Sequence, residues 1–212
     1  MAKERYEGTI GGLYRRNETF LVMSAVTFLS SLLIGYALAG LLEQIMGVAL
    51  STMKRQISQG ELKLTTLSIF MNNFKVALIL YGGGVIFGVV TAFFLIFNGL
   101  FIGYAASQFP IGDFLVYTIP HGIFEVTGII LAGAAGFRLG NGILDIVKGL
   151  RHVQSEISLK NQLLYLWDVH VDEFKDSLLL FGIAIILILI GAVIEANFTV
   201  AWGNYIKGIN TV

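Results

Sequence analysis

The stretch that decides the fold is SLLLFGIAIILILIGAVI, residues 177–194, which contains no charged residue. A run of this kind is typical of a helix that crosses a bilayer, since a span needs roughly 20 predominantly apolar residues. Three further blocks have the same character, at residues 20–42, 76–112 and 114–137, the last interrupted only by the charge of Glu125. The sequence therefore predicts an all-α fold, a polytopic transmembrane helical bundle.

Composition supports this fold class and excludes several functions. Of 212 residues, 56% are hydrophobic and only 13% are charged, with a mean hydropathy of +0.78, whereas soluble domains carry about 25% charge. Fourteen basic and fourteen acidic residues cancel, which argues against nucleic acid as a partner. With no cysteine and three histidines, we expect no metal site and no cofactor. We expect a multi-pass protein of the cell membrane, with the lipid bilayer as its principal partner.

The number of spans depends on the second block. Its 37 uncharged residues between Lys75 and Asp113 exceed one span, and its later part is interrupted by Asn98-Gly99 and by Pro110. Either one span is followed by a re-entrant piece, or two spans are present and the second is irregular. The bundle thus has four to five spans, with one broken or re-entrant helix. Asn72 and Asn73 resemble the cap that starts this block.

We treat residues 1–212 as a single membrane domain with three polar segments. These are an N-terminal segment (1–19), an amphipathic loop (43–75) and an amphipathic segment (138–176), the last two expected to form short interfacial or packed helices. They carry four, four and five Lys or Arg residues, and one more follows the last block. Five crossings with the N-terminus inside fit these numbers as well as four crossings with both termini outside. Both arrangements place 138–176 in the cytoplasm.

The third block contains the motif TIPHGIFE at residues 118–125, which places His121 and Glu125 four residues apart on one helical face. A carboxylate inside the bilayer costs several kcal/mol unless it faces protein or water. The pair therefore predicts a structural tie or a polar site. Pro120 is expected to begin the helix, so that the helix dipole favours a neutral His121 and an ionised Glu125, which attract cations. Asn98 either joins this site or caps a helix.

Small residues recur every four positions in three stretches, a spacing that lets helix backbones approach closely. They are Gly84, Gly88 and Ala92; Gly99, Gly103 and Ser107; and Gly128, Ala132, Gly136 and Gly140. On a helical wheel His121 and Glu125 share a sector with the third stretch, so the pair lies on a packed face. Arg138 lies about 100° from that sector and is expected to reach the cytoplasmic interface. Glu43 and Glu195 mark ends of spans.

Two segments resemble the stage II sporulation protein M family, over roughly residues 68–140. They are IFMNNFKVALILYGGGVIFGVVTAFFLIFNGLFIGYAASQF and TIPHGIFEVTGIILAGAAGFRLG. The resemblance implies an all-helical integral membrane protein of about five spans. In spore formers the namesake is a scaffold that gathers peptidoglycan-degrading enzymes. Family members often carry a proline soon after the Glu, whereas this chain has Val126-Thr127. The residues on the family's motif positions are Asn73, Asn98, Gly99, Pro120, His121, Gly122, Glu125, Gly136 and Arg138.

Two functions remain open from the sequence, and neither is enzymatic, because no phosphate-binding loop, dinucleotide fingerprint or nucleophile motif is present. The first is a scaffold or assembly component that forms a homo-oligomer or binds other membrane proteins. The second is a channel or transporter for a cation or small solute. Its polar site would consist of His121 and Glu125 with Asn98 and Asn73.

Overall fold

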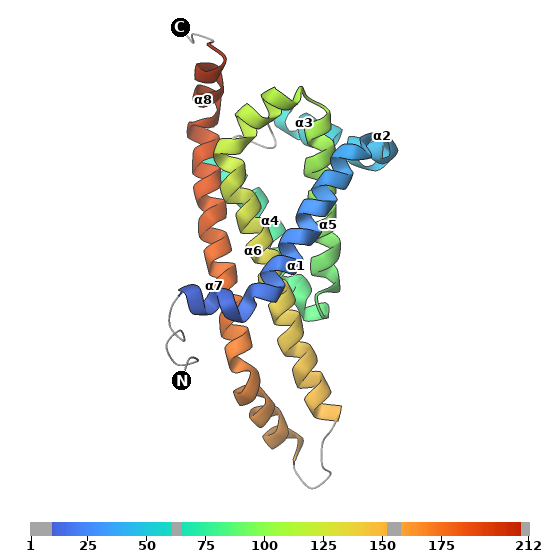
Figure 1. Cartoon of the computed structure of the whole chain (residues 1–212), viewed down its shortest axis with the longest axis vertical. Coiled ribbons are helices and arrows are strands. Elements are labelled where there is room, and N and C mark those ends of the chain that lie inside the picture. The colour runs from blue at the N-terminus through green and yellow to red at the C-terminus, as the bar shows by residue number, and fades with distance from the viewer. Residues whose placement is uncertain (1–9, 61–64, 152–157, 209–212) are drawn as a thin grey trace.

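The computed structural model describes residues 10–60, 65–151 and 158–208, and these are almost entirely helical (Figure 1). A helical bundle is therefore confirmed. The main elements, in chain order, are α1 (Ile10–Ala37), α2 (Ala39–Leu42), a π-helical turn (Glu43–Gly47), α3 (Val48–Ser58), α4 (Thr66–Gly82), a 3₁₀ turn (Gly83–Ile86), α5 (Val89–Ser107), α6 (Ile111–Arg151), α7 (Leu159–Asn197) and α8 (Thr199–Ile206).

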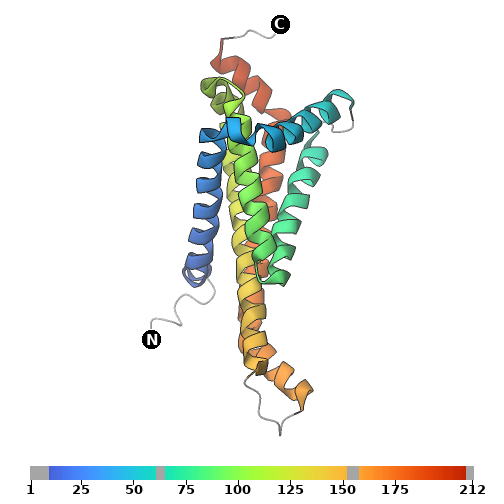
Figure 2. The same ribbon diagram turned by 90° about the vertical axis from the view of Figure 1, so that its right-hand side faces the viewer.

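Within the described residues, five helices are long and apolar enough to cross a membrane. They are formed by Gly11–Ala37, Thr66–Ile86, Val89–Ser107, Ile111–Arg151 and Leu159–Asn197. They alternate in direction, so that α1 begins at the lower end of the bundle and α7 ends at the upper end (Figure 2). Five candidate spans agree with the arrangement of five crossings and not with that of four, and the side on which the N-terminus lies stays a prediction.

The long second block divides at a glycine-rich turn between α4 and α5. Phe87 has φ 53° and Gly88 has φ 78°, and two successive left-handed residues cannot continue a helix. Thr91 donates to the carbonyl of Leu80 across this turn (2.7 Å). The break expected at Asn98-Gly99 is wrong, because both residues lie inside the continuous helix α5.

The helix that contains the third apolar block of the sequence, α6, starts earlier than the sequence predicts. α6 begins at Ile111, directly after Pro110, and Pro120 lies in its interior. A proline there removes one backbone hydrogen bond, which transmembrane helices tolerate because neighbouring groups satisfy the freed carbonyl. The expected start at Pro120 is therefore wrong. His121 lies far from the helix N-terminus, and the dipole argument for its charge does not apply.

The segment 43–75, expected to be an amphipathic loop, contains α3 and the first part of α4. α3 is the expected short amphipathic helix, but α4 already begins at Thr66, where Thr65 accepts a hydrogen bond from the amide of Ser68 (3.3 Å). Asn73 consequently lies in the middle of α4 and caps nothing. The capping role expected for it is wrong.

The segment 138–176 is not a separate helix. α6 continues to Arg151 and α7 begins at Leu159, and together they extend past the other spans as an antiparallel pair (Figures 1 and 2). Arg138 points into this pair: it lies 3.8 Å from Glu173 and its guanidinium is 5.4 Å from the ring of Phe20. Both partners of Arg138 are protein groups, and the expectation that Arg138 reaches the cytoplasmic interface stays a prediction.

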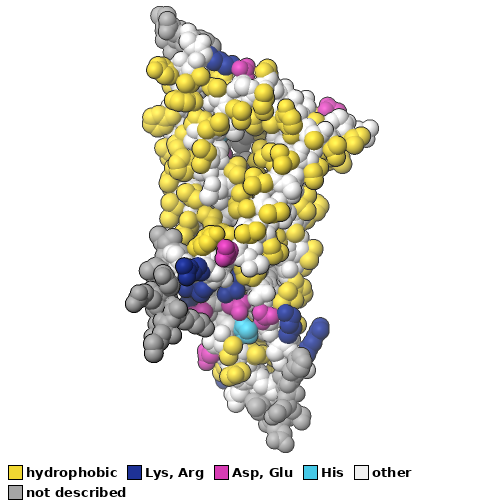
Figure 3. Space-filling model, in the orientation of Figure 1, with side chains coloured by type: hydrophobic (Ala, Val, Ile, Leu, Met, Phe, Trp, Pro, Cys, Tyr) yellow, Lys and Arg dark blue, Asp and Glu magenta, His cyan; other side chains and the backbone are white. Residues whose placement is uncertain are grey.

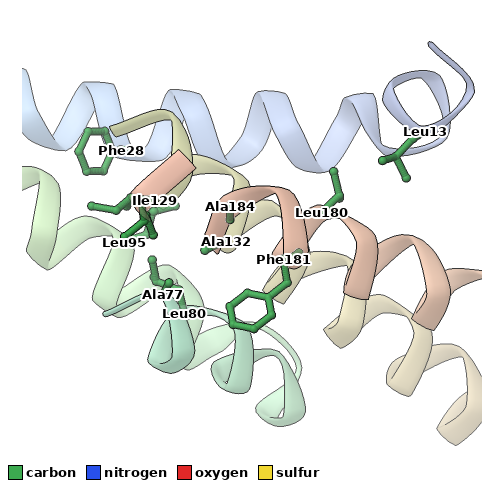
Figure 4. Packing of buried hydrophobic residues seen from close by; sticks show 12 residues of the cluster. Leu13, Phe28, Ala77, Leu80, Leu95, Ile129, Ala132, Leu180, Phe181 and Ala184 are labelled. Carbon is green, nitrogen blue, oxygen red and sulfur yellow. The ribbon is translucent and has the colours of Figure 1, made fainter. Parts of the chain in front are cut away.

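Tight contacts between small residues hold the spans together, as the sequence predicts. Ala132 and Ala184 are fully buried where α6 meets α7, beside Leu80 and Leu95 of α4 and α5 (Figure 4). A methyl group at Gly99 would lie 2.6 Å from the carbonyl oxygen of Phe28 in α1. On the face drawn in Figure 3, apolar side chains cover most of the upper part and charged ones gather below them. This surface fits a bundle surrounded by lipid.

Candidate functional site

A cavity of about 290 Å³ lies between α3, α4, α5, α6 and α7. It is in the upper half of the bundle, near the start of α4 and α6 and the end of α5 and α7 (Figure 2). The four residues of the predicted polar site all line it. Its polar lining residues are Asn72, Asn73, Asn98, Thr118, His121, Glu125 and Glu195.

Glu125 and His121 lie one turn apart on α6, as their spacing predicts. Asn73 of α4 donates a hydrogen bond to Oε1 of Glu125 (2.7 Å). Nδ1 of His121 lies 3.1 Å from Oγ1 of Thr199, at the start of α8. The two ionisable groups therefore contact different helices, Glu125 contacting α4 and His121 contacting α8.

Glu195 of α7 is the site residue that sequence reasoning missed. It lies near the end of α7, as expected, but its carboxylate faces the cavity. One ligand atom from each of His121, Glu125 and Glu195 can be chosen so that all three lie within 4.8 Å of one another. Gly191, one turn before Glu195, has no side chain at the place where Glu125 contacts α7. Gly191 and Glu195 are four residues apart and so lie on one face of α7. This spacing was the signal in the sequence that could have indicated that Glu195 faces α6.

The charges in the cavity are unbalanced. Among the lining residues that the structure describes, two are glutamates and none is Lys or Arg. Glu125 lies twelve residues after Asp113 and thirteen before Arg138, the nearest charged residues along α6. At 1.5 Å per residue these separations are about 18 and 20 Å, which places Glu125 near the middle of a hydrocarbon layer about 30 Å thick. The cavity therefore holds acidic groups where their charge is most costly.

Asn98 and Asn73 contribute differently to the site. The amide nitrogen of Asn98 donates to the carbonyl of Phe94 in its own helix (2.7 Å), which leaves its oxygen and its second N–H for the cavity. Asn73 instead reaches across to Glu125. The helix-cap reading of Asn98 is wrong, because α5 continues for nine residues beyond it, to Ser107.

The other motif residues belong to packing. A methyl group at Gly128 would lie 2.7 Å from Ile188 of α7, and Gly136 contacts the carbonyl of Leu80 in α4. Gly122 is buried on α6 next to the cavity, and Pro120 lies two residues before it.

A second polar cluster lies at the lower end of the apolar belt. Arg16 of α1 donates two hydrogen bonds of 2.8 Å to Asp176 of α7, whose side chain also accepts from Asn17 (3.0 Å). Further down, Asn141 donates to both Asp145 (2.9 Å) and Glu173 (3.2 Å). Here, in contrast to the cavity, acidic groups are matched by donors and cations, so this cluster ties α1, α6 and α7 together.

The fold and the cavity define a helical integral membrane protein with a polar site between its spans. The family model of stage II sporulation protein M matches residues 24–200. The chain therefore belongs to the stage II sporulation protein M family, as the motif around His121 predicts.

Two relatives come from Methanocaldococcus jannaschii. The uncharacterized protein MJ0793 is 30% identical over 149 residues, which cover 66% of this chain and 73% of the relative. The uncharacterized protein MJ0706 is 26% identical over 133 residues, which cover 63% of this chain and 55% of the relative. No solved structure shows a significant match to the chain.

Proposed function

We propose that this protein binds cations in the cavity around Glu125 and provides a passage for them through the membrane. The observation that carries the proposal is the pairing of Glu125 with Glu195 in a cavity whose described lining residues include no Lys or Arg.

The physical reason is the cost of an uncompensated charge. A charged side chain at the bilayer centre costs about 3 kcal/mol on the most lenient scale, and much more on others. A chain that places two carboxylates in one cavity needs protons or cations to offset them. The cavity is far larger than the roughly 30 Å³ share of one water molecule, so water can accompany the ion.

A flux assay in liposomes tests this proposal. Purified protein is reconstituted, and uptake of protons, K⁺ and Mn²⁺ is followed separately with trapped indicator dyes. We expect flux of at least one of these cations above protein-free liposomes, and its loss in Glu125→Gln. Glu18→Gln is the matched control, because Glu18 is exposed on α1 and lies outside the cavity. The absence of flux for all three ions, or flux that Glu125→Gln leaves unchanged, would refute the proposal.

We propose assembly of a membrane complex as a second function, which the α6–α7 extension favours. Beyond the other spans this pair exposes large apolar side chains, with Leu164 54% and Tyr165 69% accessible. Such side chains near charged neighbours are typical of protein contacts. The molar mass of the wild-type protein and of Leu164→Glu in nanodiscs would test the role. A larger wild-type mass that the variant loses supports self-assembly, and a monomer in both cases contradicts it.

A further inference from the structure

We infer that His121, Glu125 and Glu195 bind one divalent transition-metal ion. This inference rests on the proposed function, since it names the class of cation that the cavity takes. The three side chains come from two helices, and their ligand atoms converge within 4.8 Å. Around an ion with bonds of about 2.1 Å, ligand atoms lie about 3 Å apart in cis and 4.2 Å apart in trans positions. Small side-chain rotations therefore bring all three onto one ion.

The charge of the site selects a divalent ion. Two carboxylates and a neutral imidazole carry a charge of −2, which a divalent ion cancels. A monovalent ion would leave one negative charge in a region of low dielectric, where none of the lining residues in the described part of the chain is Lys or Arg. Neutrality of the loaded site is therefore reached with Mn²⁺, Fe²⁺, Co²⁺ or Zn²⁺ and not with K⁺ or Na⁺.

The ligand types narrow the choice further. Ca²⁺ takes six to eight oxygen ligands and Mg²⁺ keeps much of its water, so neither favours an imidazole. Imidazole together with carboxylates suits first-row transition metals. The combination of one histidine with two glutamates therefore favours these metals over the alkaline-earth ions.

Neighbouring groups already orient two of the three ligands. Asn73 holds Glu125 through Oε1, which leaves Oε2 to face an ion. Thr199 lies at hydrogen-bond distance from Nδ1 of His121, so the tautomer with a proton on Nδ1 presents the lone pair of Nε2. Contacts of this kind fix the orientation of metal ligands, and their loss typically lowers affinity by 10- to 100-fold. The cavity itself provides room for water molecules to complete the coordination shell.

A second group of metal-ligand residues in the described part of the chain lacks these properties. Asp145, His170 and Glu173 also converge, but Lys148 lies 2.9 Å from Asp145 and Arg138 lies 3.8 Å from Glu173. These cations already offset the carboxylates. This group serves as the internal control for the cavity.

Equilibrium metal binding tests the inference without reference to flux. Chelator-treated protein in detergent is titrated with Zn²⁺ and Mn²⁺, and with Mg²⁺ and K⁺ for comparison. We expect one Zn²⁺ or Mn²⁺ per chain, an affinity at least tenfold lower in Glu195→Gln, and no change in Glu173→Gln. Electron spin echo spectra of bound Mn²⁺ should show coupling to one imidazole nitrogen, which His121→Gln removes. This signal is read on the wild-type protein and remains informative if a variant fails to fold.

The possible results separate the inference from the proposed function. No binding of Zn²⁺ or Mn²⁺, equal binding in Glu195→Gln, or Mn²⁺ without nitrogen coupling would each overturn the metal site. Proton or K⁺ flux that depends on Glu125, without metal binding, overturns the site and leaves the cation passage standing. Metal binding without flux of any cation overturns the cation passage and leaves the metal site standing.

Discussion

Gly99 offers a direct measure of how tightly the spans are packed. It lies on α5 against α1, and a methyl group there would come within 2.6 Å of the carbonyl oxygen of Phe28 and 2.8 Å of Cβ of Ser31. The first atom belongs to the backbone, so no side-chain rotation relieves the contact. Restoring an ordinary separation of about 3.4 Å requires the helices to move apart by about 0.8 Å. Neighbouring backbone contacts of Gly35 and Gly103 resist that movement.

We therefore expect Gly99→Ala to destabilise the protein. Overpacking of this kind typically costs 1–3 kcal/mol, whereas alanine in a helix gains up to about 1 kcal/mol over glycine. Gly182→Ala is the matched control: Gly182 is also a glycine within a transmembrane helix, and nothing lies within 4 Å of its added methyl group. The difference between the two variants isolates the packing cost, about 2 kcal/mol, which is roughly a 30-fold change in the unfolding equilibrium constant.

Unfolding in mixed micelles by titration with sodium dodecyl sulfate, followed by far-ultraviolet circular dichroism, gives the two free energies. We expect the midpoint of Gly99→Ala to fall and that of Gly182→Ala to stay or rise. If the two variants agree within 0.5 kcal/mol, the backbones of α1 and α5 are not in contact, and the reasoning from small residues fails.

Two further predictions concern the lower cluster and the orientation of the chain. Asp176→Asn removes the carboxylate that pairs with Arg16, and we expect the free energy of unfolding to fall by about 1–3 kcal/mol. The loss is smaller than for a fully buried pair because Arg16 is partly exposed. A double-mutant cycle with Arg16→Gln should give a coupling energy between the two residues, and additive effects of the two substitutions would contradict this prediction. Because the chain has no cysteine, Ser58→Cys and Lys160→Cys report the two ends of the bundle in intact cells. The positive-inside rule predicts that an impermeant maleimide labels Ser58→Cys alone, and the opposite labelling would invert the orientation.

Much of the fold could be predicted because apolar length and small-residue spacing are local properties of the sequence. The helix boundaries were harder. Pro110 and Pro120 are both compatible with a first turn, and the sequence cannot tell which of them neighbouring helices tolerate inside a span. Similarly, the second block contains glycines at 82–84 and again at 99. Only the left-handed Phe87-Gly88 pair shows which of them reverses the chain.

The candidate site was predictable only in part, for a related reason. His121 and Glu125 stand out because they interrupt an apolar run, but Glu195 ends such a run and resembles an ordinary boundary residue. Seventy residues separate it from Glu125. The packing of α7 against α6, with Gly191 opposite Glu125, brings the two carboxylates together. Long-range helix registration of this kind is not written in either segment alone.

The two halves of the bundle differ in a way that constrains any passage of cations. The cavity lies around Glu125, whereas further down the chain at the end of α4 meets α6 backbone to backbone, where Gly136 contacts Leu80 of α4 and Gly84 of the 3₁₀ turn. Tyr81 and Phe181 also stack between α4 and α7, with ring centroids 4.3 Å apart. On the proposed function, an ion bound at Glu125 would meet these contacts on its way to the lower end of the bundle. Passage requires α4 to separate from α6 and α7, so the small residues that stabilise the bundle also set the barrier to its opening.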